Sequence, residues 1–233
     1  MQLEMPYTMV VSGQTGSGKT CFVERLIKNQ EAMHDKPFDR IILAYSIMQP
    51  MYLKLQSEID NLELVDGFPE DNFENLPGNT LLILDDLMLE LENDRRLASM
   101  FTKMRHYNIS TIFIVQNLYH NSKYMRTVTR NSHYLVVFPN PRDMGMIMTL
   151  GRQIYPMNSK FLPDAFLQAT KKPFGYLFID LKPGTDSKFR LRDCVFPDEQ
   201  CFRRSDSSFF SLILIDAAIA LLGETCLNFL AVP

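Results

Sequence analysis

The chain has 233 residues, 46% of them hydrophobic and 22% charged, and its formal net charge is −3 at pH 7. These values are ordinary for a soluble globular protein with one sizeable α/β core and room for a small appendage. The slightly acidic balance gives no global signal for nucleic acid, so any DNA contact has to come from a local basic surface, often one shared among subunits.

The four cysteines and four histidines form no metal-binding pattern. The cysteines, Cys21, Cys194, Cys201 and Cys226, have neither the paired spacing of a zinc site nor the density of a disulfide scaffold. This usage is typical of buried thiols in a reducing compartment. We therefore expect an intracellular, soluble protein.

The first motif along the chain is a complete phosphate-binding loop. It follows the apolar run 7–12 and opens a segment in which Phe22, Leu26 and Ile27 have helical spacing. Strand, glycine-rich turn and helix are the context in which the G-x-x-x-x-G-K-[ST] pattern binds phosphate through inward-facing backbone N–H groups. A Gly/Ser-rich surface turn is the alternative, but these flanks favour a nucleoside triphosphate site. Its predicted residues are Gly13, Gln14, Thr15, Gly16, Ser17, Gly18, Lys19 and Thr20.

Two residues of this loop have further predicted roles. Lys19 is placed to contact the β- and γ-phosphates, and the Thr20 hydroxyl to bind Mg²⁺.

Short apolar runs without alternation recur between stretches with helical spacing. The predicted strands are 7–12, 40–45, 81–84, 111–115 and 134–138. The predicted helices are 18–29, 51–59, 94–105, 142–153 and 158–169. Runs of this kind are typical of parallel strands covered on both faces, and their alternation with helices predicts a doubly wound α/β sheet. Segments 175–181 and 189–192 flank Lys182–Asp186 and predict a terminal β-hairpin at one sheet edge.

A hydrophobic strand at 81–84 ends in two acids, Asp85 and Asp86. An ATPase needs a carboxylate at the carboxyl end of a strand beside the phosphate loop to hold hydrated Mg²⁺, and a second acid beside it can polarise the attacking water. Asp85 suits the first role and Asp86 the second. Taken alone, the pair is better explained as the end of a strand, because Asp is common at turns. The loop upstream favours the functional interpretation.

Two further side chains suit an ATPase. Gln116 follows the apolar strand 111–115, where an amide would hydrogen-bond the γ-phosphate or the water; an ordinary loop residue is the equal alternative. Arg105 precedes that strand and would reach a neighbouring subunit's nucleotide as an arginine finger. On its own, Arg105 is better explained as a solvated charge at a helix C-terminus.

Together these motifs resemble the FtsK/HerA superfamily, and within it the compact genome-packaging ATPases of poxvirus-like large DNA viruses and of Polinton/Maverick elements. The resemblance covers about residues 1–199. The segments that carry it are Gly13–Thr20, Leu81–Asp86, Arg105–Ser110, Ile112–Asn117, Arg130–Tyr134, Asn140–Asp143, Gly175–Pro183 and Arg190–Pro197.

The resemblance implies a RecA-like P-loop fold: a mostly parallel sheet with helices on both faces. An additional strand, ending at Gln116, lies between the phosphate-loop (Walker A) strand and the Asp85 (Walker B) strand. It implies ATP and Mg²⁺ as cofactors, held by Lys19, Thr20 and Asp85. Asp86 would activate water, Gln116 would sense phosphate, and Arg105 would act in trans, with Arg130 as the next candidate. Asp86 stands where much of the superfamily has Glu, which we interpret as a mark of the viral packaging branch.

The resemblance also implies partners. It indicates a homo-oligomeric ring, usually a hexamer, that pumps double-stranded DNA into a capsid, with capsid proteins as further partners. The site of action would be the virion or virus assembly site, or the host cytoplasm or nucleus if the gene is an integrated element. Apart from the resemblance, Arg152, Lys160, Lys171 and Lys172 are candidate DNA contacts only because they cluster in the later part of the core; a solvated surface is the better explanation for each.

The end of the chain differs in kind from the rest. We assign 1–199 to the P-loop ATPase domain, 200–208 to a polar linker and 209–233 to an apolar tail of unassigned role. A spanning helix needs about twenty apolar residues, and Asp216, Gly223 and Glu224 interrupt this run. We therefore favour a docking helix or an unrelated extension over membrane association of 209–222.

Three functions are thus open. The leading hypothesis is an ATP-driven DNA translocase or packaging motor. A small P-loop nucleotide or metabolite kinase would share the loop, but it would need a substrate lid and usually lacks the paired acids beside a Gln-ended strand. An inactive, nucleotide-binding relic of a packaging ATPase, integrated in a host genome, is the third.

Overall fold

A computed structural model describes residues 2–69, 73, 76, 78–87, 91, 94–118, 123–141 and 143–199. The described residues belong to one compact unit, Met1–Glu199. The predicted linker 200–208 and tail 209–233 lie outside the described residues, so their assignment stays a prediction.

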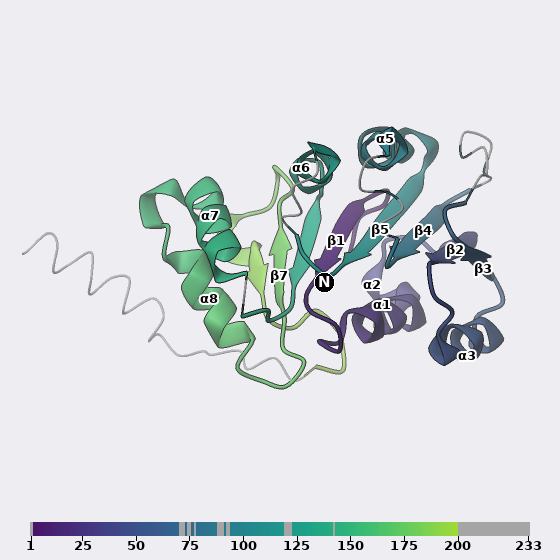
Figure 1. Cartoon of the computed structure of the whole chain (residues 1–233), viewed down its shortest axis with the longest axis horizontal. Helices are drawn as coiled ribbons and strands as arrows, with labels where there is room; N and C mark the ends of the chain where they lie inside the picture. The colour runs from purple at the N-terminus through teal and green to yellow at the C-terminus, as the bar shows by residue number, and fades with distance from the viewer. Residues whose placement is uncertain are drawn as a thin grey trace, which may run out of the picture. The chain divides into compact units, whose positions relative to one another are not determined.

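The core of this unit is a single mostly parallel sheet (Figure 1). The strands, in the order in which they lie side by side, are β3 (Leu62–Asp66), β2 (Arg40–Tyr45), β4 (Thr80–Asp85), β5 (Ile109–Val115), β1 (Thr8–Ser12), β6 (Tyr134–Val137), β7 (Leu177–Asp180) and β8 (Leu191–Arg192). Strands β1 to β6 run parallel, and β7 and β8 are antiparallel to their neighbours.

This order confirms the predicted additional strand. β5 lies between β1 and β4, with Ser12 opposite Val115 and Asp85 opposite Ile114. The carboxyl ends of three neighbouring strands therefore meet at one edge of the sheet, which we call the carboxyl edge. The terminal hairpin β7–β8 is also as predicted. Because β7 is antiparallel, its first residue, Leu177, lies opposite Val137 at this same edge.

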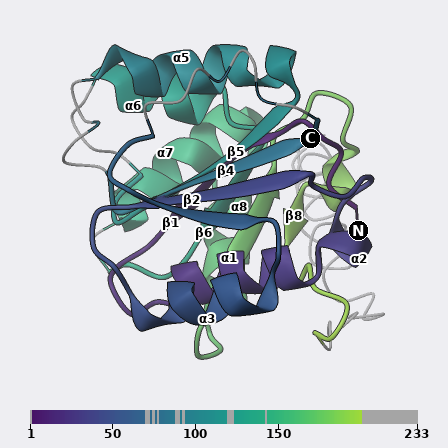
Figure 2. The same ribbon diagram turned by 90° about the vertical axis from the view of Figure 1, so that its right-hand side faces the viewer.

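Helices cover both faces, as Figure 2 shows. One face carries α5 (Arg95–Lys103), α6 (Lys123–Arg130), α7 (Met144–Ile154) and α8 (Phe161–Ala169). The other carries α1 (Lys19–Lys28), α2 (Gln30–Met33) and α3 (Pro50–Glu58). The strands serve both layers by simple alternation: Leu82 and Leu84 pack with the first set of helices, Leu81 and Ile83 with the second. This two-sided burial explains why the strand sequences are continuously apolar.

Several elements differ from the sequence-based expectation. β3, α2 and α6 were not predicted. β3 is a half-buried edge strand with alternating polar residues, and α2 and α6 are short. The helix predicted over 94–105 ends at Lys103, and a 3₁₀ turn, Met104–Tyr107, carries Arg105. The helix predicted over 158–169 begins only at Phe161, after a second 3₁₀ turn at Pro156–Asn158.

The expectation of buried thiols is wrong for the described cysteines. Cys21 is exposed, and Cys194 is half-buried and disulfide-bonded. Within the described ranges there is no helix long and apolar enough to cross a membrane, and no group of three or more His, Cys, Asp or Glu side chains arranged to hold a metal.

The opposite end of the parallel strands, the amino edge, contains a closed polar network. Tyr7 Oη lies 3.0 Å from His34 Nε2, and His34 Nδ1 lies 3.1 Å from the Gln30 carbonyl oxygen. The two rings stack with centroids 5.7 Å apart. Burial lowers the pKa of His34 to about 4, so the imidazole is neutral: Nδ1 donates to Gln30, and Nε2 accepts from Tyr7.

Candidate active site

The phosphate-binding loop connects β1 to α1 at the carboxyl edge of the sheet. Two of its glycines are required by geometry. A Cβ on Gly13 would lie 2.5 Å from the Cβ of Phe138, which no real contact allows. Gly18, at the N-cap of α1, has φ 105°, a conformation that L side chains rarely adopt. The loop can therefore turn tightly against β6 and present its N–H groups at the helix N-terminus.

Lys19 is the cation of the loop. Its Nζ donates to the carbonyl oxygens of Gly13 at 2.7 Å and Gln14 at 3.0 Å. Burial lowers the pKa of Lys19, while the negative charges of Asp85 and Asp86 oppose that shift. The ammonium thus lies between the loop and both acids, where a triphosphate would need it.

Asp85 lies at the carboxyl end of β4 and is almost fully buried, with 4% of its surface exposed. Its Oδ2 accepts a hydrogen bond from Tyr52 Oη at 2.7 Å and from Thr20 Oγ1 at 3.3 Å. Burial raises the pKa of Asp85, and the charge of Asp86 adds to this, whereas the two hydroxyl donors and Lys19 lower it. The two predicted Mg²⁺ ligands, Thr20 and Asp85, are therefore in contact.

Asp86 and Gln116 form the next pair. Gln116 Nε2 donates to Asp86 Oδ1 at 3.2 Å, which joins the carboxyl ends of β4 and β5. The backbone of Asp86 is left-handed, with φ 55°. Asp tolerates this conformation better than most residues, but it still costs energy and is often found at functional sites. It turns the chain so that neighbouring Asp85 and Asp86 occupy different positions in one site.

These groups share a cavity of about 380 Å³. Its lining includes six of the predicted site residues outside the first part of the loop: Gly18, Lys19, Thr20, Asp85, Asp86 and Gln116. Thr15 and Gly16 line it as well, and Gly13, Gln14 and Ser17 shape the loop behind it. The sheet order explains this convergence, because the residues come from the ends of three adjacent strands.

The donor set fits a Mg²⁺–triphosphate. A carboxylate and a hydroxyl oxygen are ligands that Mg²⁺ prefers, and an ammonium and a helix N-terminus suit phosphate oxygens. The hydroxyls of Ser12 and Ser17, at the two ends of the loop, are also buried without a hydrogen-bond partner among the described residues. Buried polar atoms of this kind are expected where a polar ligand binds.

Arg105 is not part of this cavity. It is exposed and lies before the first residue of β5, whereas Gln116 follows the last. The seven residues of β5 separate the two side chains, about 23 Å at strand rise. Burial lowers the pKa of His133, and the charges of Lys182 and Arg105 lower it further, so Arg105 lies near the amino edge. Arg130, at the end of α6, is exposed as well.

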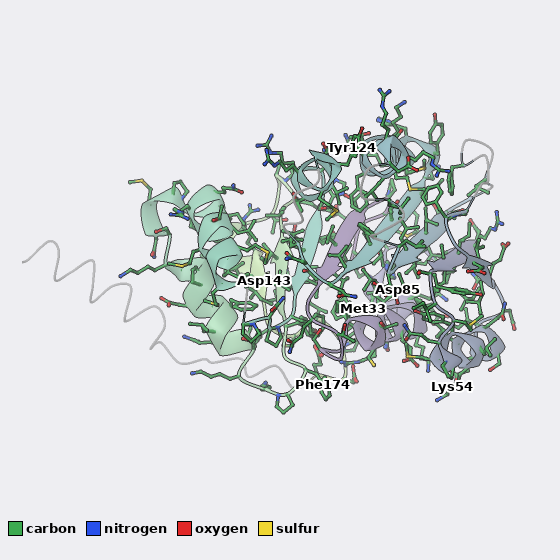
Figure 3. The ribbon with its side chains drawn as sticks, viewed as in Figure 1. Met33, Lys54, Asp85, Tyr124, Asp143 and Phe174 are labelled. Carbon is green, nitrogen blue, oxygen red and sulfur yellow. The ribbon has the colours of Figure 1, made fainter. Side chains whose placement is uncertain are left out.

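Several residues at the site were not predicted from the sequence. Gln49, Pro50 and Met51, at the start of α3, line the cavity together with Phe174, and Tyr52 contacts Asp85. Tyr52 lies on α3 and reaches Asp85 from the far side of β2; no local pattern distinguishes it from an ordinary core tyrosine. Phe174 lines the cavity from the loop between α8 and β7 and is labelled in Figure 3 with Asp85. The turn sequence Lys172-Pro173-Phe174-Gly175 is the pattern that could have drawn attention to Phe174.

Residues 60–160 match the family model described as the poxvirus A32 protein. Among solved structures, the chain is similar to the genome packaging NTPase B204 from Sulfolobus turreted icosahedral virus 2. The structure in complex with ATP-gammaS has 16% sequence identity and a TM-score of 0.53, covering 82% of this chain and 98% of that one. The complex with AMPPCP has 18% sequence identity and a TM-score of 0.52, covering 80% of this chain and 96% of that one. The complex with sulfate has 16% sequence identity and a TM-score of 0.54, covering 83% of this chain and 99% of that one.

No curated protein matches the chain. At these identities the structural matches establish the fold, and the family match extends from β3 to the 3₁₀ turn before α8. The segment matched includes both acids, Arg105 and Gln116. The comparisons thus support the resemblance drawn from the motifs in two respects: residues 60–160 are similar to the poxvirus A32 protein family, and the chain shares its fold with the genome packaging NTPase B204.

Proposed function

We propose that this protein hydrolyses ATP to ADP and phosphate and uses the energy to translocate double-stranded DNA into a viral or virus-like capsid. One observation carries the proposal. Lys19, Thr20, Asp85, Asp86 and Gln116 converge on one cavity from the ends of two adjacent strands, β4 and β5, and from the start of α1. ATP analogues are bound in two of the three matched structures, which supports ATP as the nucleotide.

Different residues of the cavity would bind the phosphates and the Mg²⁺. The loop N–H groups and Lys19 would hold the β- and γ-phosphates, and Thr20 and Asp85 would hold Mg²⁺. When bound, Mg²⁺ would neutralise charge on the phosphate oxygens. The Tyr52 hydroxyl fixes one Asp85 oxygen at 2.7 Å, so the carboxylate cannot rotate freely. The 3.3 Å contact between Thr20 and Asp85 keeps both ligands on the same side of the loop.

Asp86 and Gln116 act on the water. Asp86 accepts a proton from the attacking water as the water oxygen bonds to the γ-phosphorus and the bond from that phosphorus to the oxygen of the leaving ADP breaks. The Gln116 amide, which already donates to Asp86, orients that carboxylate and reaches toward the γ-phosphate side of the cavity. Hydrolysis replaces the γ-phosphate of ATP, the group that Gln116 would contact, with free phosphate. Gln116 would therefore sense the state of the nucleotide.

The proposal includes a homo-oligomeric ring, most simply a hexamer. Arg105 lies too far from its own phosphate loop to reach it, so it would act on a neighbour's nucleotide. DNA would bind a surface repeated by the ring symmetry.

The described cations suggest two places for that DNA surface. The predicted contacts Arg152, Lys160, Lys171 and Lys172 are all exposed, near α7 and α8. A denser set lies on α5, the 3₁₀ turn and α6, with only Asp94 as an acid among the described residues there. Its exposed members are Arg95, Arg96, Lys103, Arg105, His106, Arg126 and Arg130.

The deciding experiment measures ATP hydrolysis with and without linear duplex DNA, with Lys19→Ala as the inactive control. A motor is stimulated by DNA. A kinase ignores DNA but phosphorylates an acceptor, and a relic hydrolyses nothing. Comparing Lys103→Glu/Arg126→Glu with Lys171→Glu/Lys172→Glu at several salt concentrations locates the DNA surface. The pair on that surface reduces the salt dependence of DNA binding, and the other pair leaves it unchanged.

A further inference from the structure

A phenylalanine occupies a position in the site where local chemistry calls for glycine. Lys172 to Gly175 form a turn closed by a hydrogen bond from Gly175 N to Lys172 O at 2.9 Å. Pro173 is the second residue and Phe174 the third, with φ 58°. Proline followed by a positive φ describes a type II turn, whose third residue is normally Gly or Asn. For a bulky residue this conformation is a true outlier, and the surrounding structure has to hold it in place.

The turn is held from two directions. Gly175 lies so close to the end of α8 that a Cβ would be 2.4 Å from the Ala169 carbonyl oxygen. On the other side, Tyr176 is buried and leads directly into β7. Between these anchors the Phe174 side chain is 69% exposed. The backbone strain is therefore not offset by burial of the ring.

The ring lies at the start of the phosphate-loop helix. A Cβ placed on Gly18 would be 3.3 Å from Phe174 Cδ1. Because β7 begins at the carboxyl edge, its preceding turn approaches the loop from the β6–β7 side. Asp85, Asp86 and Gln116 approach the same loop from the opposite side, through β4 and β5.

This arrangement orients the nucleotide. If the γ-phosphate faces the acids and Gln116, the rest of the nucleotide extends away from them, past Gly18, toward Phe174. We propose that Phe174 is the platform on which the nucleobase stacks, and that its strained turn presents the ring for this purpose. The inference rests on the proposed function, because it identifies the residue that binds the base of the same nucleotide whose phosphates bind the loop. Stacking uses the face of the base, so the platform favours large purines without distinguishing adenine from guanine.

The test separates the base from the phosphates. Binding of Mg²⁺–ATP and of Mg²⁺–tripolyphosphate is measured by calorimetry for the wild type, Phe174→Ala and Phe174→Tyr. Phe189→Ala is the matched control, because Phe189 is also exposed, at 59%, but lies on the β7–β8 connection away from the cavity. We expect Phe174→Ala to weaken ATP binding about 10-fold and to leave tripolyphosphate binding unchanged. Phe174→Tyr and Phe189→Ala should bind both as the wild type does.

Two results would overturn the platform while leaving the proposed function intact: Phe174→Ala binding ATP like the wild type, or losing affinity for both ligands equally. The second would mean that the ring only supports the loop. A wild type that binds neither ligand would instead overturn the proposed function, and the platform with it.

A stability measurement tests the strain independently. Phe174→Gly should match or exceed the wild type in melting temperature, because Gly accepts φ 58° at no steric cost. The same variant should bind ATP as weakly as Phe174→Ala. A melting temperature several degrees below the wild type would show that the ring contributes to folding, and would contradict a side chain kept for ligand binding.

Discussion

The two edges of the parallel strands are built by different rules. At the carboxyl edge, Asp86 and Phe174 have left-handed backbones, Asp85 is a buried acid with a raised pKa, and Lys19 is a partly buried base with a lowered one. At the amino edge, the remaining non-glycine residue with positive φ in the described chain is Asn108, a residue type that tolerates it.

The buried polar groups do not divide in the same way. His34 and Tyr7 satisfy each other at the amino edge, but Gln30 Oε1 and the Thr111 hydroxyl there have no described partner, and neither do the Ser12 and Ser17 hydroxyls by the phosphate loop. The difference between the edges therefore lies in the strained backbones and the shifted pKa values of the carboxyl edge, which are costs that a bound ligand would offset.

The largest expected effect on ATP hydrolysis comes from substituting Arg105. This residue lies at the amino edge but has a proposed catalytic role in trans, so it tests whether function is confined to the carboxyl edge. Arg105→Ala should bind ATP and assemble normally, yet hydrolyse ATP about a thousandfold more slowly. Mixing it with Lys19→Ala should restore part of the activity, since one subunit brings the arginine and the other the phosphate loop. Steady-state hydrolysis by rings shown to be mixed is the measurement. Without recovery the trans role is wrong, and Arg130→Ala is tested next.

Asp86→Asn tests the strained acid. The amide keeps the size and accepts the left-handed backbone, but it cannot take a proton from water. We expect ATP binding to be retained and turnover to fall by about 10²- to 10⁴-fold. Single-turnover hydrolysis beside a binding measurement separates the two effects. Turnover at the wild-type rate would remove Asp86 from the mechanism.

His34 tests the amino edge. Its pKa is depressed from 6.5 to about 4 by burial. Below pH 6.5 the unfolded chain binds a proton that the folded state excludes. The free energy of unfolding is therefore unaffected by protonation of His34 above pH 6.5 and decreases as the pH falls toward 4. The full loss is about 3 kcal/mol. Urea unfolding of the wild type and His34→Gln between pH 7 and pH 4.5 measures it, with exposed His106→Gln as the control. An equal pH dependence in wild type and His34→Gln would contradict the neutral network.

Asp85→Asn is the smallest and most specific test of the cost at the carboxyl edge. Because burial raises the pKa of Asp85, the charged carboxylate destabilises the ligand-free protein at neutral pH, and this penalty fades as the pH falls through the raised pKa. Asparagine keeps an oxygen for Tyr52 without the charge. We expect the ligand-free variant to melt higher at pH 7, by about 2–4 °C, with a smaller difference at pH 5. Calorimetry should also show lost Mg²⁺-dependent ATP binding. A lower melting temperature at pH 7 would mean that the buried charge is fully compensated.

Most of the sheet and the site's inner residues were predictable because they depend on local patterns. The phosphate-binding loop Gly13–Thr20 and the two acids after 81–84 are recognisable because their functional groups are consecutive in sequence. The continuous apolar runs indicated strands that are buried on both faces. The strand order came from the resemblance, since periodicity does not say which strands are neighbours. β3 and α6 were missed because their sequences are short or half polar. Tyr52 and Phe174 were missed because they reach the site only through tertiary structure, across β2 and through the turn before β7.

The central position of β5 has a mechanical consequence. All seven of its residues are buried, and it is hydrogen-bonded to β4 on one side and β1 on the other. A strand held in this way cannot stretch or buckle within a close-packed core. Arg105 and Gln116 lie beyond its two ends, so β5 is a rigid connection between the proposed phosphate sensor and the surface proposed to face a neighbouring subunit. Under the proposed function, a displacement of Gln116 on hydrolysis would be passed along this strand toward Arg105.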